Sequence, residues 1–333
     1  MTSLVTKYLG LELAHPIIVG ASPIADDLEK VLLLEDAGAP ALVMRSIFEE
    51  QIVLEQMAAH RHYDTHVDAE AGSIAPNTNV FALGLDAYLQ QLRRIRERTS
   101  LKVIASLNGT SSGGWLEYAR GLEQAGAHAL ELNLYVIATD AMRPSQEVEA
   151  QQLATVRDVV KAVKIPVAVK LSPFYSSLPN FVKGLEASGA QGAVLFNRVY
   201  QADIDPVKLE AVRELRLSKP EELLLRLRWL AIVSPQTKLD LAVTGGVHSA
   251  NDAIRAIMAG AHVVQVVSTL LEKGASQVRR ISEGVRQFLQ EQEYESVSVM
   301  RGNMNRSHSP DPSAYERSDY MQLLQSWHGH FGN

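Results

Sequence analysis

The sequence repeats one tripeptide at places where an alternating α/β chain would need it. Ala-Gly-Ala or Ser-Gly-Ala occurs four times, at residues 37–39, 125–127, 188–190 and 259–261. Each copy follows a helix-like stretch and precedes a short apolar run. Glycine is the usual residue just past a helix end because it adopts positive φ without strain. The small neighbours allow a tight turn into a buried strand, so the repeat predicts the helix-to-strand turns of a parallel α/β protein.

Eight short apolar runs are separated by amphipathic stretches. The runs cover residues 16–20, 41–44, 102–106, 129–133, 167–171, 192–196, 241–243 and 263–267. Most do not alternate between apolar and polar residues, which is typical of strands covered on both faces. Leu85, Tyr88, Leu89 and Leu92 have helical spacing, and Ser249 with Asp252 resembles a capping box. The alternation predicts a (β/α)8 TIM barrel, with a doubly wound open sheet as the alternative.

The length of 333 residues would allow two domains, but we find no independent second unit. We expect one barrel domain over residues 1–300, with insertions near 46–80 and 202–236. The second insertion holds extra polar helical sequence, with a helix start at Pro220. A polar C-terminal tail over residues 301–333 is expected to wrap the barrel or to meet a partner subunit.

Composition excludes several functions. There are 32 Lys and Arg residues against 38 Asp and Glu residues, a net charge of −6, and no cysteine. This balance argues against nucleic-acid binding and against an anionic membrane surface as partner. Without cysteine the chain cannot hold a disulfide, a cysteine-ligated zinc, an iron–sulfur cluster or a thiol nucleophile. We see no signal peptide and no membrane span, so a cytoplasmic location is expected.

Polar residues cluster at the predicted strand ends, where barrel enzymes place their active groups. Amide donors and a lysine suit a flat heteroaromatic ligand with carbonyls, and a Gly-Gly turn after the seventh strand suits a phosphate. The candidate ligand-binding residues are Ala21, Ser22, Arg45, Ser46, Ser106, Asn108, Asn133, Lys170, Asn197, Thr244, Gly245, Gly246, Val267 and Ser268.

Several of these residues lie in motifs that resemble the dihydroorotate dehydrogenase family, in its order and spacing, over most of residues 5–275. The motifs are Ala-Ser at 21–22, Glu-Leu-Asn-Leu at 131–134, Val-Lys-Leu-Ser-Pro at 169–173, Asn197, Thr-Gly-Gly-Val at 244–247 and Gly-Ala-His-Val-Val-Gln-Val at 260–266. The resemblance implies a barrel that binds flavin mononucleotide (FMN) and an oxidoreductase acting on CH–CH groups in pyrimidine biosynthesis.

The resemblance also implies roles for individual residues. Gly245, Gly246 and Ser268 would hold the FMN phosphate. Lys170 would lie against the pyrimidine edge of the flavin, where a cation stabilises the anionic reduced ring. Asn133 and Asn197 would lie where flavin and substrate meet, so these two and Lys170 are the predicted catalytic residues. The family's Lys-Ser after the second strand is Arg45-Ser46 in this chain.

The substrate side departs from the family. After the Glu-Leu-Asn-Leu motif the family places a Cys or Ser base, followed by Pro-Asn. Here the base position falls on Val136, which cannot accept a proton, and the substrate-binding Asn falls on Ala138. The family's Asn-rich substrate loop is only loosely matched by residues 77–79. None of the other hydroxyl side chains considered as a replacement for the base is favoured: Thr110, Tyr135, Tyr175 and Tyr200.

The leading interpretation is an FMN-dependent oxidoreductase that passes hydride from a dihydropyrimidine-like substrate to the flavin. The alternatives are a flavin oxidoreductase on another substrate, a phosphate-binding barrel lyase or isomerase that uses Lys170, and a flavin-binding partner protein without turnover. Expected partners are a small-molecule substrate, a soluble electron acceptor or redox partner protein, and a second copy in a homodimer. Arg198 could pair with an anionic substrate or lie on the surface. His60, His62 and His66 read as a solvated loop rather than a metal site.

Overall fold

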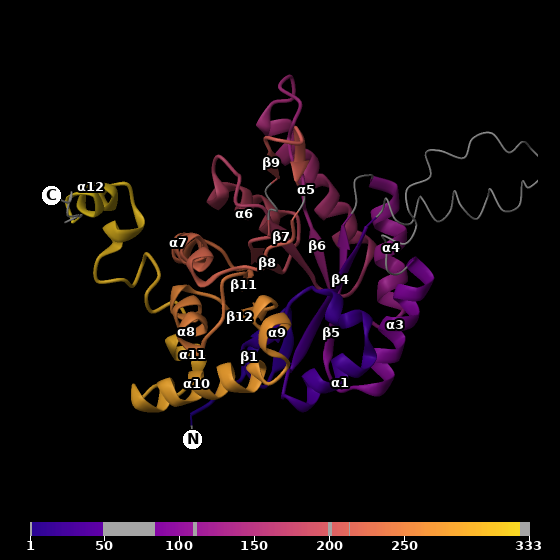
Figure 1. Ribbon diagram of the computed structural model, residues 1–333, viewed down its shortest axis with the longest axis horizontal. Coiled ribbons are helices and arrows are strands. Elements are labelled where there is room, and N and C mark those ends of the chain that lie inside the picture. Colours follow the sequence, from indigo (N-terminus) through magenta and orange to yellow (C-terminus); the bar gives the residue numbers. More distant parts are fainter. Residues whose placement is uncertain (1, 49–83, 109–111, 199–201, 213, 327–333) are drawn as a thin grey trace, which may run out of the picture.

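The fold is a closed barrel of eight parallel strands surrounded by helices (Figure 1). The computed structural model describes residues 2–48, 84–108, 112–198, 202–212 and 214–326. The sheet order is β11-β12-β3-β4-β5-β6-β7-β8, and pairing of β11 with β8 closes it. This closure confirms the TIM barrel and excludes the open sheet. The strands are β3 (Ile17–Val19), β4 (Ala41–Phe48), β5 (Lys102–Asn108), β6 (Ala129–Asn133), β7 (Val167–Leu171), β8 (Gly192–Leu195), β11 (Asp240–Thr244) and β12 (Val263–Val266).

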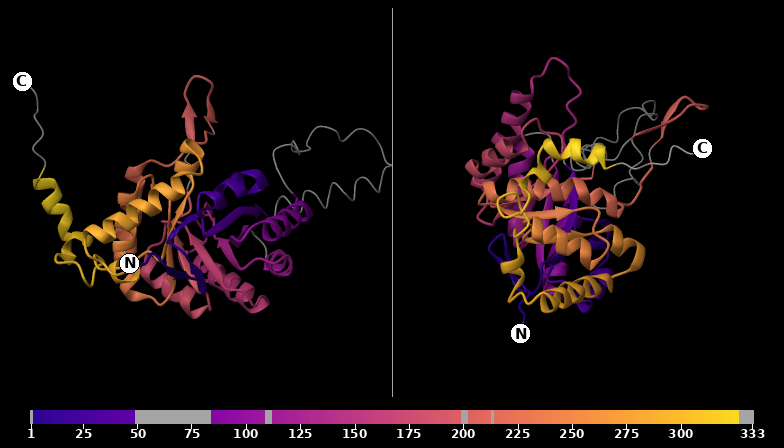
Figure 2. Two further views of the ribbon diagram at one scale, coloured as in Figure 1. Left: turned by 90° about the horizontal axis from the view of Figure 1, so that it is seen from below. Right: turned by 90° about the vertical axis from the view of Figure 1, so that its left-hand side faces the viewer.

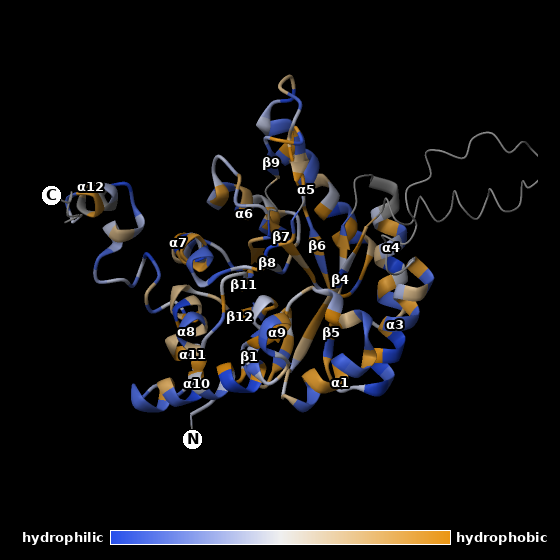
Figure 3. Cartoon of the chain, in the orientation of Figure 1, coloured by the Kyte–Doolittle hydropathy of each residue, from blue (hydrophilic) through white to orange (hydrophobic). Residues whose placement is uncertain are grey.

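One outer helix follows each strand along the chain. These helices are α1 (Leu28–Asp36), α3 (Leu85–Arg98), α4 (Ser112–Gln124), α5 (Ser145–Ala162), α6 (Leu178–Ala187), α7 (Leu223–Val233), α8 (Ala250–Ala259) and α10 (Gln277–Glu291). The short helix α9 (Ser268–Lys273) lies between β12 and α10. Figure 3 shows hydrophilic and hydrophobic residues interleaved along these helices. In α3 the buried side chains include Tyr88 and Leu92, as the spacing predicts, and the capping box of Ser249 and Asp252 begins α8.

The repeated tripeptides form the predicted turns. Their glycines all have positive φ, and in each copy the following alanine donates its N–H to the carbonyl five residues back, at 3.0 to 3.2 Å. This is the hydrogen bond that closes a Schellman turn at a helix end. The glycines are Gly38, Gly126, Gly189 and Gly260. The four turns lie at the amino-terminal end of the barrel, opposite the expected site.

An apolar floor fills the amino-terminal half of the barrel. It combines side chains from all eight strands with those of the hairpin formed by β1 (Thr6–Tyr8) and β2 (Leu11–Leu13). Four strand positions are alanine, which leaves room for the hairpin's Tyr8, Leu9 and Leu13. The barrel floor consists of Tyr8, Leu9, Leu13, Ile18, Ala41, Val43, Ile104, Ala129, Ala168, Val194, Ala242 and Val263. Polar side chains inside the barrel therefore lie above it, toward the carboxyl ends of the strands.

Two expectations about strand ends need correction. Arg45 and Ser46 lie within β4, not after it, because the β4–β5 pairing shifts register between Val43 and Ser46 and the strand continues. Similarly, β5 runs on through Ser106 to Asn108.

The insertion near 202–236 was predicted to hold extra polar helical sequence, and the strands at its start were not predicted. Residues 203–212 form an antiparallel hairpin of β9 (Asp203–Asp205) and β10 (Glu210–Val212). The helix begins later, at the predicted Pro220, with η3 (Pro220–Glu222) leading into α7. Most of the insertion near 46–80 lies outside the described residues.

The tail beyond residue 300 begins against the barrel and ends away from it. After α11 (Val297–Met300), backbone N–H groups of Gly302 and Arg306 bond to carbonyls of Ile257 and Ala231, in α8 and α7, at 3.0 and 2.9 Å. The chain continues through η5 (Pro312–Tyr315) to α12 (Ser318–Gln325), which projects from the body (Figures 1 and 2). Within the described ranges, the search for a helix long and apolar enough to cross a bilayer found none.

Candidate active site

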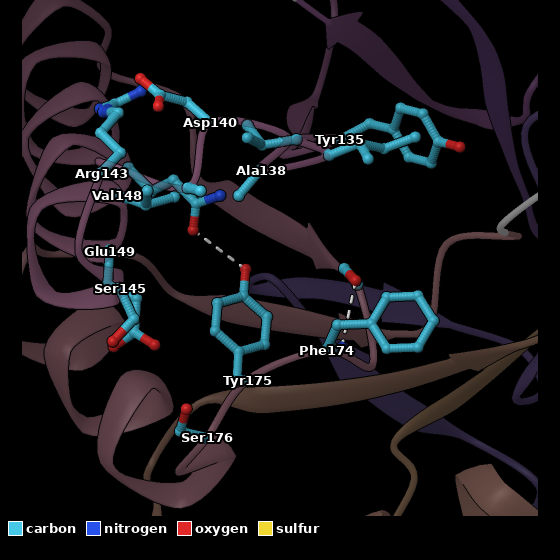
Figure 4. A pocket seen from close by; sticks show the side chains of 15 residues that line it. Tyr135, Ala138, Asp140, Arg143, Ser145, Val148, Glu149, Phe174, Tyr175 and Ser176 are labelled. Carbon is cyan, nitrogen blue, oxygen red and sulfur yellow. Dashed lines mark hydrogen bonds between the residues drawn. The ribbon is translucent and has the colours of Figure 1, made fainter.

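Two hollows open at the carboxyl end of the barrel. The larger, of about 480 Å³, lies between the segments that follow β6 and β7 (Figure 4). The smaller, of about 260 Å³, lies over the ends of β3, β7, β8, β11 and β12, and we call it the basic pocket. Its volume is near the lower end for ligand sites. Nine of the fourteen candidate residues line the basic pocket: Ala21, Ser22, Lys170, Asn197, Thr244, Gly245, Gly246, Val267 and Ser268. The larger hollow has none of them, so the basic pocket is the better candidate despite its size.

Four cationic side chains line the basic pocket, and Arg216 among them is 68% exposed and paired with Glu214 outside the lining. Lys170, Arg198, Arg216 and Arg226 all line it, and none of its described lining residues is Asp or Glu. Arg198 is half-buried and its Nη2 lies 3.5 Å from Oε1 of Glu222, behind the lining. Clustered cations in a concave site raise the local concentration of anions. The pocket is therefore suited to a ligand that carries negative charge.

Lys170 lies at the bottom of the basic pocket, at the end of β7. The residue is 7% exposed, so its side chain does not extend into solvent. Its Nζ lies 3.3 Å from Oε1 of Glu131, on the neighbouring strand β6. The Gln265 side chain, from β12, donates from Nε2 to Oε2 of the same carboxylate at 2.7 Å. Three strands thus hold the ammonium group inside the barrel, directly above its floor.

The turn after β11 accepts only glycine. Gly245 and Gly246 have φ of 91° and 79°. A Cβ on Gly245 would lie 2.7 Å from Nη2 of Arg226, and a Cβ on Gly246 would lie 2.5 Å from the backbone nitrogen of Leu223. Both neighbours belong to α7, so this helix packs directly behind the turn. Close packing and positive φ together explain the predicted Gly-Gly motif.

Arg226 ties α7 to this turn. Its guanidinium donates from Nε to the carbonyl of Thr244, and from Nη1 to the carbonyl of Glu222 at 2.6 Å. Burial lowers the pKa of Arg226, while the Glu222 carboxylate opposes that shift. A guanidinium remains charged under such shifts because its ordinary pKa is above 12. The turn thus has a buried positive charge immediately behind its backbone.

Ser218 is a site residue that the sequence did not reveal. Its Oγ lies 2.7 Å from Oγ of Ser268 and accepts the backbone N–H of Gly246 at 3.1 Å. Its own N–H donates to Oγ of Ser268 at 3.0 Å. Ser218 follows no strand, so a search of strand ends could not find it. The Pro220 helix start two residues later was the only nearby signal.

The two predicted asparagines contact each other. Nδ2 of Asn197 donates to Oδ1 of Asn133 at 2.8 Å, which joins the end of β6 to the segment after β8. Asn197 lines the basic pocket, whereas Asn133 lies behind it and is buried. The pair therefore has a structural contact, and one of its members is also available to a ligand.

Four candidates on β4 and β5 do not line the basic pocket: Arg45, Ser46, Ser106 and Asn108. The Oγ atoms of Ser46 and Ser106 lie 2.7 Å apart. Nε of Arg45 lies 3.2 Å from Oδ2 of Asp26, whose pKa burial raises against the opposing effect of Arg45. The structure thus separates this group from the nine residues that it brings together.

The larger hollow contains the altered substrate segment. Val136 and Ala138 line it, together with Tyr135 and Tyr175 (Figure 4). The hydroxyl of Tyr175 donates to Oε1 of Gln152 at 3.1 Å, and burial raises its pKa well above the ordinary value. Tyr175 is therefore a poor substitute base.

The remaining candidates from the sequence cannot be placed. Thr110, Tyr200 and the histidines at 60, 62 and 66 lie outside the described residues. In the part of the chain that is described, no three His, Asp or Glu side chains gather as metal ligands.

The fold and the basic pocket together define a (β/α)8 barrel protein with a hollow lined by cationic residues at the loops after its seventh and eighth strands, where barrels commonly bind phosphate. Sequence comparison identifies its family. The sequence model for dihydroorotate dehydrogenase matches residues 75–289, about two thirds of the chain. The chain belongs to the dihydroorotate dehydrogenase family, which confirms the resemblance seen in its motifs.

Curated relatives agree with this assignment. A putative dihydroorotate dehydrogenase A (fumarate) of Aeropyrum pernix is 29% identical over 304 residues, covering 90% of this chain and 96% of the relative. The catalytic subunit of a dihydroorotate dehydrogenase B (NAD(+)) of Thermoplasma acidophilum is 28% identical over 312 residues, covering 91% and 99%. The corresponding subunit of Pyrococcus abyssi is 28% identical over 307 residues, covering 88% and 96%. The similarity therefore extends over nearly the whole barrel.

Proposed function

We propose that this chain is an FMN-dependent oxidoreductase whose flavin site is the basic pocket. One observation carries the proposal: four cations, a glycine turn that no larger residue fits, and paired serine hydroxyls converge on one hollow without a carboxylate in its described lining. FMN has a phosphate dianion at one end and a ring edge of carbonyl and N–H groups at the other. The lining offers a partner for each end.

The residues present fit this cofactor. At the phosphate end we assign the backbone N–H groups of Gly245 and Gly246, the Ser268 hydroxyl and the charge of Arg226. Ser218 forms hydrogen bonds with both Gly246 and Ser268. It would either bind the phosphate itself or release these two groups so that they bind it. Such N–H groups and hydroxyls are ordinary phosphate ligands.

At the ring end we assign Lys170, Asn197, Ser22 and Gln265. Oγ of Ser22 and Oε1 of Gln265 are buried and, among the described residues, have no hydrogen-bond partner. Both residues line the basic pocket. A buried polar atom without a partner costs roughly 1–3 kcal/mol, so a ligand with ring N–H groups and carbonyls would relieve that cost. When bound, FMN would accept a hydride from the substrate, and the ammonium of Lys170 would stabilise negative charge at this edge.

The residues on the substrate side are compatible with two kinds of substrate, and in both a CH–CH bond is oxidised. Dihydroorotate, or a related dihydropyrimidine, is the first. Val136 lies where the family has its base, so the substrate proton would have to leave by another group or by water. Loss of a general base typically costs roughly 10²- to 10⁴-fold in rate.

A different CH–CH substrate is the second candidate, and the larger hollow favours it. Ile137 and Phe174 line that hollow and are 63% and 75% exposed, next to Val136. Asp140, Arg143 and Glu149 also line the hollow, so this second substrate would have both an apolar and a polar part. A lyase or isomerase that forms a Schiff base on Lys170 is less favoured, because Nζ of Lys170 is paired with the buried Glu131 carboxylate at 3.3 Å.

For partners, we propose a small-molecule substrate and either a soluble electron acceptor or a redox partner protein. The chain has no cysteine with which to bind an iron–sulfur relay. We also propose a homodimer, and a barrel domain over residues 1–300 with a separate tail over 301–333.

Visible absorbance tests the proposal. Purified protein is expected to show the flavin bands, or to acquire them when the apo-protein is mixed with FMN. In the second step, dihydroorotate is added under anaerobic conditions. Bleaching supports a dihydropyrimidine substrate, with a group other than Val136 taking the proton. Persistent bands support the cofactor and point to another substrate. A protein that neither holds nor binds FMN refutes the proposed function. Lys170→Met serves as the matched variant, expected to bind FMN more weakly.

A further inference from the structure

Glu131 is a buried carboxylate that the proposed cofactor could not touch directly. The residue is 1% exposed and does not line the basic pocket, whereas its partner Lys170 does. Glu131 also lies deeper in the barrel: on the paired strands β6 and β7, Asn133 is level with Lys170 and Glu131 is level with Ala168 of the floor. Any effect of Glu131 on a bound ligand would therefore act through Lys170.

The carboxylate is fixed from two sides. Its Oε1 faces Nζ of Lys170 at 3.3 Å, and its Oε2 accepts Nε2 of Gln265 at 2.7 Å. Gln265 is 0% exposed, so its amide has no solvent alternative to this bond. An amide in a closed interior that binds one oxygen leaves the other oxygen in a defined position. Strand β12 thus orients the carboxylate toward β7.

Space in the barrel wall allows this arrangement. Gly20, at the end of β3, lies beside Gln265, and a Cβ on it would be 3.2 Å from Cβ of Gln265 and 2.7 Å from Cγ2 of Val267. A larger residue at position 20 would therefore crowd Gln265 and Val267. On the floor side the hydroxyl of Tyr8 is also buried, and burial together with the nearby Glu131 raises its pKa, so the phenol stays neutral. Lys170 and Glu131 thus remain each other's nearest opposite charges.

We propose that Glu131 is a positioning residue that holds the Lys170 ammonium group at the ring end of the basic pocket, with Gln265 orienting the carboxylate. The inference rests on the proposed FMN site. A buried ammonium without a counter-ion is costly and tends to lose its proton or to move. Removing Glu131 would therefore remove the cation from the pocket without touching a residue that lines it.

The direction in which the flavin midpoint potential changes distinguishes this positioning role from a direct electrostatic effect of Glu131 and from a purely structural role. Deleting a negative charge near a flavin, with Lys170 unchanged, raises the midpoint potential because the reduced ring is anionic. Deleting the counter-ion of Lys170 lowers the potential, because the nearby cation is lost. A purely structural role leaves the potential of the bound flavin unchanged.

The test compares Glu131→Gln, Lys170→Met and the double variant, with Glu186→Gln as control. Glu186 is a carboxylate at the amino-terminal end of the barrel that bonds Lys238 and Thr237. Two quantities are measured: the Kd of apo-protein for FMN by flavin fluorescence, and the midpoint potential of bound flavin by dye equilibration. We expect E131Q to raise Kd about tenfold with Lys170 present and less than twofold in the Lys170→Met background, as for coupled neighbours.

The potential should fall in E131Q, in the same direction as in Lys170→Met. A potential that rises or stays unchanged in E131Q, or an equal loss of affinity in both backgrounds, overturns the inference. If E131Q does not fold, Glu131→Asp takes its place, because the shorter side chain withdraws the carboxylate from Nζ of Lys170 without changing a residue that lines the pocket. There too the potential should fall, and an unchanged potential overturns the inference. A parent protein that binds no FMN would instead refute the proposed function, so the two failures are distinguishable.

Discussion

Replacing Gly246 by alanine should disrupt the turn behind the basic pocket. Two costs combine at this position. The backbone has φ of 79°, and a left-handed conformation costs a residue with a Cβ roughly 1–2 kcal/mol. The added carbon would also lie 2.5 Å from the backbone nitrogen of Leu223, so α7 or the turn must move. Overpacking of this kind costs typically about 1–3 kcal/mol. The expected loss of unfolding free energy is therefore about 3 kcal/mol.

Gly38→Ala is the matched control for this prediction. Gly38 has φ of 92°, and a Cβ there would meet no atom within 4 Å. It should lose only the conformational part, about 1 kcal/mol. The assay is guanidinium unfolding followed by circular dichroism, together with FMN titration of the apo-proteins.

Only Gly246→Ala should weaken FMN binding, by about tenfold, which corresponds to about 1.4 kcal/mol. Equal losses of unfolding free energy in the two variants would show that the contact with Leu223 adds nothing to the cost of the Gly246 substitution. Unchanged FMN affinity in Gly246→Ala would show that the turn does not hold the phosphate.

Three further predictions concern other parts of the barrel. Burial, and to a smaller extent the charge of Arg301, lowers the pKa of His262 to about 4, compared with about 6.5 in the unfolded chain. The unfolded chain therefore binds the proton more readily, so the stability present above pH 6.5 is lost as the pH falls toward 4. Denaturant midpoints at pH 7 and 4.5 should differ less in His262→Asn, and an equal difference contradicts the assignment. Ser218→Ala leaves the Gly246 N–H without its acceptor, so apo-protein stability measured by the same unfolding assay should fall by about 1 kcal/mol, whereas no loss would show that water replaces the hydroxyl. Val136→Cys should speed anaerobic bleaching by dihydroorotate roughly 10²-fold if only the base is missing, and stopped-flow absorbance at an unchanged rate would show that dihydroorotate is not the substrate.

Local patterns were sufficient to predict the barrel. Each of the four tripeptides ended a helix with the same hydrogen bond, and each apolar run became a strand, because these features depend on neighbouring residues. Strand lengths were less predictable. Ser46 lies within β4 because its backbone pairs with Ser106 of β5, a contact between residues 60 apart. The hairpin at 203–212 was missed because its strands are short and exposed and so leave no apolar run in the sequence.

The site shows the same division. Lys170 and the glycines at 245 and 246 were found because a strand end and a Gly-Gly turn are visible in the sequence. Ser218 and Arg226 were not, because each reaches the pocket from the segment between β8 and β11 rather than from a strand end. Glu131 was noticed only as part of a motif. Its contact with Lys170 depends on which residues face each other across two strands, and on a glutamine 134 residues further along the chain.

The apolar floor limits how a catalytic cycle could proceed. Because the hairpin side chains of Tyr8, Leu9 and Leu13 fill the barrel from below, a ligand in the basic pocket can be approached only from the carboxyl side. Electron donor and electron acceptor would then both reach the cofactor from this side. If they share one of its two hollows, the first product must depart before the oxidant arrives. Steady-state rates for the proposed enzyme should follow ping-pong kinetics, with parallel double-reciprocal lines and inhibition by excess of either substrate.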